Sequence, residues 1–79
     1  MLNRIVVENL NKRIRDQYDT ESGFDYIKAI SVSTGISENR IKKILSGATD
    51  TKITLKDLEK FANALKVEAL DIVTKKGNN

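Results

Sequence analysis

The chain has 79 residues, of which 14 are lysine or arginine and 11 are aspartate or glutamate, so its net charge is +3. It contains neither cysteine nor histidine, which excludes disulfide bonds and metal sites built on thiolates or imidazoles. A chain of this length folds as one domain with a small core, so its stability must come from helix packing or from a second copy of the chain.

No apolar run approaches the roughly 20 residues that a membrane span requires, and residues 1–4 do not begin a signal peptide. We therefore expect a cytoplasmic protein that contacts no membrane. The chain has no glycine-rich phosphate loop and no room for a deep pocket, so we expect no enzymatic activity, no cofactor, no metal and no small-molecule ligand. The domain is expected to span residues 1–74, followed by a flexible tail at residues 75–79.

The apolar periodicity predicts an all-α fold of four to five short helices around one core. Val7, Leu10 and Ile14 recur at helical spacing and predict a first helix over residues 3–18. The polar stretch at residues 19–23 ends in a glycine and predicts a loop.

A second helix is predicted after this loop. Asp25 can cap its N-terminus, and Phe24 directly before the cap is expected to act as an apolar anchor. Ile27 and Ile30 would form its buried side, and Gly35 would end it in the left-handed conformation.

A third helix is predicted over residues 38–46, with Ser37 as its N-cap and Gly47 at its end. The turn that joins it to the second helix, residues 34–37, reads Thr-Gly-Ile-Ser. Gly35 permits a sharp reversal there, and Ile36 is expected to point inward. Because so short a connection fixes two helices at a steep angle, the third helix can protrude from the surface.

After a polar loop at residues 48–53, Thr54 and Asp57 predict a capping box at the start of a fourth helix. Four apolar residues are expected on the buried side of that helix: Leu55, Leu58, Ala62 and Leu65. Leu70 and Val73 predict a short fifth helix.

The C-terminal segment also bears on assembly. Val67, Leu70, Ile72 and Val73 are together more apolar than one short helix can bury, so some of them are expected to face a second subunit in a homodimer. In the alternative, Leu70 and Val73 complete the core of a monomer, and Ile72 is singly exposed.

The third helix has two chemically different faces. At about 100° per residue, Ile41, Ile44 and Leu45 fall on one side. The opposite side carries four polar residues: Asn39, Lys42, Lys43 and Ser46. Such amide, ammonium and hydroxyl groups suit base edges and phosphates in the major groove of DNA, which is wide enough to admit one helix.

The same two-faced pattern is typical of any solvated surface helix. Two further features favour the DNA-binding interpretation: the tight turn before the helix, and a zoned distribution of charge. Residues 1–18 and 36–53 are predominantly basic, whereas residues 19–25 are acidic.

Over residues 10–73 the sequence resembles the lambda-repressor and Cro-like helix-turn-helix family. Residues 10–15, LNKRIR, are similar to the family's first-helix pattern of a leucine, polar residues and an isoleucine between basic residues. Residues 30–44 resemble the motif core, residues 45–47 the end of the recognition helix, and residues 54–67 the following helix and turn. The resemblance implies that the third helix enters the major groove and that symmetric dimers bind half-sites about 34 Å apart.

The chain departs from the family at four positions. Leu45 stands where glutamate is frequent, and Lys66 where glycine or asparagine is common. Ser31 stands where alanine is usual, and its hydroxyl is expected to bond back to a carbonyl one turn earlier. Ile27 occupies the place of a polar DNA contact, which leaves Tyr26 and Lys28 as the nearest substitutes.

The resemblance implies that Asn39 and Lys43 read bases, since asparagine pairs with adenine and lysine contacts guanine. Glu38 could accept a hydrogen bond from cytosine or repel phosphate, or it could simply favour the helix dipole. Eight residues are expected to contact phosphate: Tyr26, Lys28, Ser37, Arg40, Lys42, Ser46, Thr49 and Lys52. For Thr49 and Lys52, an ordinary solvated loop explains the residues equally well.

The expected partner is therefore double-stranded DNA, and the expected function is that of a sequence-specific transcriptional regulator, a small repressor of the phage or mobile-element type. A controller protein of a restriction–modification system is a close variant. The alternative is a protein-interaction module, such as an antitoxin or an antirepressor, whose third helix meets protein instead of DNA. The acidic segment at residues 19–25 keeps that alternative open.

Overall fold

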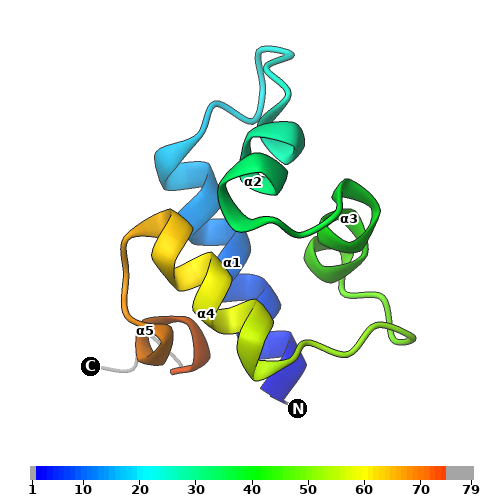
Figure 1. The fold of residues 1–79 in the computed structure, drawn as a ribbon, viewed down its shortest axis with the longest axis vertical. Coiled ribbons are helices and arrows are strands. Elements are labelled where there is room, and N and C mark those ends of the chain that lie inside the picture. The colour runs from blue at the N-terminus through cyan, green and yellow to red at the C-terminus, as the bar shows by residue number, and fades with distance from the viewer. Residues whose placement is uncertain (1, 75–79) are drawn as a thin grey trace.

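The computed structural model describes residues 2–74, which form five helices (Figure 1). In chain order these are α1 (Leu2–Gln17), α2 (Tyr26–Thr34), α3 (Glu38–Ser46), α4 (Leu55–Leu65) and α5 (Ala69–Val73). The predicted all-α class with four to five helices is confirmed, and within residues 2–74 none of the helices has the length and apolar character that crossing a bilayer demands. The expected flexible tail at residues 75–79 lies outside the described part of the chain.

All five helices contribute side chains to one hydrophobic core. Leu10 of α1, Ile41 of α3, Phe61 of α4 and Ile72 of α5 are each 0% exposed, and Ile30 of α2 is 1% exposed. Because each helix buries an apolar stripe against the others, the helices hold one another in place, although α2, α3, α4 and α5 are each too short to be stable alone.

Three amide side chains of α1 reach the C-terminal ends of three other helices. Asn9 Nδ2 donates to the carbonyl of Ile72 in α5 at 2.6 Å, Asn11 Nδ2 to the carbonyl of Leu45 in α3 at 3.0 Å, and Gln17 Nε2 to the carbonyl of Leu65 in α4 at 2.7 Å. The last carbonyls of a helix have no partner within that helix. The amides of α1 therefore satisfy these groups and fix three helix ends to one central helix.

The predicted helix caps are confirmed. Asp25 Oδ1 accepts the N–H of Lys28 at 3.0 Å, and Thr54 and Asp57 form a reciprocal capping box at the start of α4. Gly35 and Gly47 end α2 and α3 in the left-handed conformation.

Lys66 ends α4 in the same conformation, with a φ of +59°. A side chain with a Cβ is disfavoured there, so glycine or asparagine would adopt this conformation at a lower cost.

Three expectations about apolar residues are wrong. Phe24 is 51% exposed and does not anchor the start of α2. Leu55 is 68% exposed because it lies in the first turn of α4, outside the core, whereas Leu58 in the next turn is buried in it. In α5, Leu70 is 70% exposed whereas Ile72 is fully buried, the reverse of the monomer alternative. Residues two apart on a helix point about 200° apart, so only one of this pair can face the core.

Candidate nucleic-acid interface

The turn between α2 and α3 is held by hydroxyl groups of α2. Thr34 Oγ1 accepts the N–H of Ile36 at 3.1 Å and donates to the carbonyl of Ile30 at 2.7 Å. Ser31 Oγ donates to the carbonyl of Ile36 at 2.6 Å, and Gly35, at a φ of +77°, donates its N–H to the carbonyl of Ser31. Both backbone groups of the buried Ile36 are therefore satisfied, which fixes the direction in which α3 leaves the turn.

The expectation that Ser31 bonds back to a carbonyl one turn earlier is wrong. Its hydroxyl reaches forward into the turn, and Thr34 makes the bond to the preceding turn of α2 instead. The physical reason is the reversal at Gly35, which brings the carbonyl of Ile36 within reach of Ser31.

The two faces of α3 are separated as predicted. Ile41 and Ile44 are 0% and 2% exposed, and Leu45 is half-buried. The four polar residues of the opposite face are all exposed: Asn39, Lys42, Lys43 and Ser46. Since α3 packs on α1 and α2 and lies at one side of the molecule (Figure 1), its polar face is open to solvent.

The N-terminal turn of α3 is capped by Ser37, whose Oγ accepts the N–H of Arg40 at 3.2 Å. Glu38 is exposed in that first turn, where a carboxylate is favoured by the helix dipole. Of the predicted residues on α2, Lys28 is exposed, whereas Tyr26 is half-buried against the core. Lys28 is therefore the more accessible of the two substitutes.

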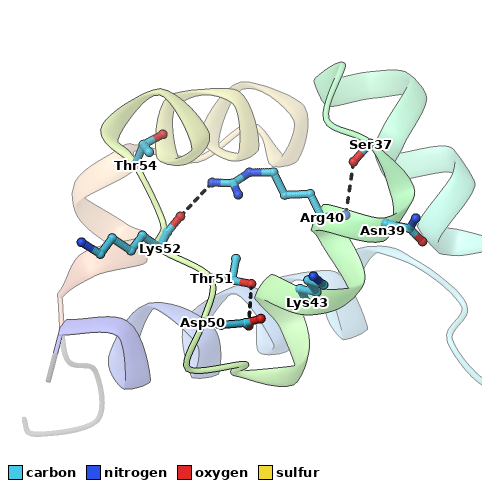
Figure 2. A pocket seen from close by; sticks show the side chains of 8 residues that line it. All are labelled: Ser37, Asn39, Arg40, Lys43, Asp50, Thr51, Lys52 and Thr54. Carbon is cyan, nitrogen blue, oxygen red and sulfur yellow. Dashed lines mark hydrogen bonds between the residues drawn. The ribbon is translucent and has the colours of Figure 1, made fainter.

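An open hollow of about 640 Å³ lies between α3 and the loop that follows it (Figure 2). We call it the α3 hollow, and eight residues line it: Ser37, Asn39, Arg40, Lys43, Asp50, Thr51, Lys52 and Thr54. Thr51 is buried and its hydroxyl bonds to Asp50 at 3.2 Å, whereas Thr49 and Lys52 on the same loop are exposed. The structure thus brings Asn39, Lys43 and Lys52 onto one concave surface.

Arg40 crosses from α3 to the start of α4. Its Nη2 donates to Asp57 Oδ2 at 2.5 Å and to the carbonyl of Lys52 at 2.7 Å, and its Nε lies 3.4 Å from Asp57 Oδ1. The side chain of Asp57 is 8% exposed and that of Arg40 is 37% exposed. We refer to this pairing as the Arg40–Asp57 bridge.

The bridge stabilises the charged forms of both partners. Burial disfavours the ionised carboxyl of Asp57, but hydrogen bonds from Arg40 and from Thr54 outweigh it, so the pKa of Asp57 lies below its ordinary value of 3.8. The hydrogen bond to Asp57 raises the pKa of Arg40 above its already high ordinary value. Arg40, predicted from the sequence as a phosphate contact, is therefore bound by the protein's own carboxylate.

Sequence reasoning missed two contributions to this surface. Asp57 was expected only as a capping residue, and its second role depends on a partner 17 residues away. Asn11, which holds the C-terminal end of α3 from 34 residues away, carried no sequence signal beyond being polar.

A comparison of the chain with protein-family models, with curated proteins and with solved structures finds no match. The case for a nucleic-acid interface therefore depends on the residues of α3, its turn and the α3 hollow.

Proposed function

We propose that the protein is a sequence-specific transcriptional regulator that binds double-stranded DNA through a helix-turn-helix formed by α2 and α3. The observation that carries the proposal is the exposure of Asn39, Lys42 and Lys43 on a helix whose opposite side is anchored by buried isoleucines. An α-helix with side chains is about 10–12 Å across, which fits a major groove about 12 Å wide. The simplest such regulator is a repressor of the phage or mobile-element type, which acts by occupying its operator.

Within this proposal, Asn39 and Lys43 read base edges, and Glu38 either accepts from cytosine or discourages wrong sequences. Lys42 and Ser46 contact phosphates beside the groove. Three further residues outside α3, all exposed, are proposed to contact the DNA backbone: Lys28, Thr49 and Lys52.

We further propose that the protein binds as a symmetric homodimer. The molecule measures 33 × 27 × 20 Å, and its longest dimension is close to the roughly 34 Å between two half-sites one helical turn apart. Leu70 is exposed on α5, beside the half-buried Val67 and Val73, and supplies an apolar surface for the contact. Ile72 is part of the core and is not available to a partner. Sedimentation equilibrium at micromolar concentration, with and without DNA, tests this, and a strict monomer in both cases contradicts it.

The first experiment measures binding to a random-sequence duplex by fluorescence anisotropy across salt concentrations. We expect measurable affinity at low salt that falls steeply as salt rises, because lysine–phosphate contacts release counterions. Salt-independent binding, or no binding at low salt, contradicts the proposal and favours the protein-interaction alternative.

The second experiment selects bound sites from a random duplex library and then compares two neighbouring lysines. Lys43→Ala is expected to relax the preference at one base pair, at a cost of about 1–3 kcal/mol. Lys42→Ala should weaken all sequences alike, and Lys60→Ala on the exposed face of α4 serves as a matched control. Equal, sequence-independent losses from the two α3 variants would show that Lys43 does not read a base.

A further inference from the structure

Arg40 differs from the other two basic residues of α3. Lys42 and Lys43 extend into solvent, whereas the guanidinium of Arg40 is already bound by Asp57 and by the carbonyl of Lys52. Arg40 nevertheless lines the α3 hollow and keeps 37% of its side chain exposed (Figure 2). A strong phosphate-binding group therefore lies at the proposed interface but is held by an internal anion.

Carboxylate and phosphate compete for the same edge of a guanidinium, because both accept its planar pair of N–H groups. Asp57 has the advantage of being in place before DNA arrives. Its Oδ2 also accepts the backbone N–H of Thr54 at 2.9 Å, and the side chain is almost fully buried, so it cannot swing away with Arg40. Arg40 could present the Nε and Nη2 edge of its guanidinium to a phosphate only by breaking the Arg40–Asp57 bridge and leaving a nearly buried carboxylate without its counter-ion.

We propose that Asp57 is a positioning residue that keeps Arg40 away from the DNA backbone and thereby limits the sequence-independent part of the affinity. This inference depends on the proposed function. Every phosphate contact adds to the affinity for all sequences alike, and the number of such contacts sets the slope of affinity against salt. A free Arg40 would add a phosphate contact and make the dependence of affinity on salt steeper. By binding Arg40, Asp57 keeps that dependence shallower.

The test measures binding of random-sequence duplex across salt for four chains: wild type, Asp57→Asn, Arg40→Gln and the double variant. Asparagine at position 57 retains an oxygen that can accept the N–H of Thr54 but lacks the charge that holds Arg40. We expect Asp57→Asn to bind more tightly, with a logarithmic salt slope steeper by about 0.9. The loss of affinity between about 50 and 200 mM salt then grows about three- to fourfold.

Arg40→Gln decides whether the released guanidinium is responsible. Arg40→Gln alone leaves the carboxylate of Asp57 without its counter-ion, so the informative comparison is with the double variant, which removes both charges. Because Arg40 is engaged in the wild type, the double variant should return to the wild-type slope. Asp50→Asn is the matched control, since it removes a carboxylate from the same hollow without releasing a cation. Its effect on affinity should not depend on Arg40.

Three results would overturn the inference: an unchanged slope in Asp57→Asn, a steeper slope that persists in the double variant, or a double-variant slope flatter than that of the wild type. A bridge that only supports the fold would lower the melting temperature of Asp57→Asn without steepening its slope. If Asp57→Asn does not fold, the double variant is decisive, because it removes both charges and a slope flatter than that of the wild type would show that Arg40 already contacts phosphate. Failure of the wild type to bind any duplex refutes the proposed function itself, and is thereby distinguished from these outcomes.

Discussion

The two connections of α3 are built in different ways. On its N-terminal side, the turn from α2 is held by hydroxyl groups of Ser31 and Thr34, which bond to groups no more than five residues away. On its C-terminal side, the longer loop to α4 is held by Arg40 in the first turn of α3, which bonds to the loop carbonyl of Lys52 and to Asp57 of α4. A short turn can be fixed by neighbouring side chains, whereas a long loop needs a tertiary contact, so the two sides of α3 should respond differently to substitution.

The largest effect is expected at Asp57. Asp57→Ala removes both the second half of the α4 capping box and the counter-ion of Arg40, so the free energy of unfolding should fall by about 2–3 kcal/mol. Urea denaturation followed by circular dichroism measures the loss. Glu59→Ala, on an exposed position of the same helix, should change stability by less than about 0.5 kcal/mol.

The contribution of Arg40, the partner of Asp57 in the bridge, can be tested by the same measurement. In an Arg40→Met background, Asp57→Ala should cost less than in the wild type, because the two residues act on one interaction. Additive losses would show that the bridge contributes little, and that the capping box accounts for the whole effect.

On the other side of α3, Thr34→Val should lower the free energy of unfolding by about 1–2 kcal/mol, because it leaves the buried N–H of Ile36 without an acceptor. Thr34→Ser retains the hydroxyl and should cost less. Since the turn directs α3, Thr34→Val should also weaken duplex binding at temperatures where it remains folded. Equal stability of the valine and serine variants would show that the hydroxyl does not hold the turn.

A smaller effect is expected from acid. The pKa of Asp57 is lowered in the folded protein, so its ionised form contributes stability that is complete above the ordinary value of 3.8 and is lost as pH falls through the folded value. The stability difference between wild type and Asp57→Asn should therefore shrink as pH falls from about 6 to about 3. The pKa of Asp19 is also lowered, by hydrogen bonds from Ser22 and Glu21. The stability that Asp19 loses in acid is the same in the wild type and in Asp57→Asn, so it cancels in the difference. A difference that is constant with pH would show that the charge of Asp57 does not stabilise the fold.

The difference between the two connections also explains which features the sequence could predict. The caps at Asp25, Ser37 and Thr54 and the glycine ends of α2 and α3 depend on residues within one turn of each other, and the structure confirms them. The polar face of α3 followed from helical periodicity in the same way. Contact of that face with DNA remains a prediction.

The long-range contacts could not be predicted, because they depend on how the helices are arranged. Asn9 and Gln17 bond to carbonyls 63 and 48 residues away, and nothing near them in the sequence distinguishes them from other polar residues. The burial of Ile72 instead of Leu70 could not be predicted for the same reason. Both suit a core, and only the position of α5 against α1 and α4 determines which side chain is buried.

The smallest effect concerns a third connection, between α4 and α5, where Lys66 occupies the left-handed conformation that Gly35 and Gly47 occupy at the ends of α2 and α3. Lys66→Gly removes the steric cost of a Cβ at positive φ, so we expect the free energy of unfolding to rise by about 0.5–1 kcal/mol. The same substitution at Lys60, inside α4, should instead lower it by about 1 kcal/mol, because glycine is a poor helix former. Opposite signs for one chemical change would isolate the backbone conformation as the cause, whereas a loss at both positions would show that the side chain of Lys66 stabilises the end of α4 by more than its strain costs.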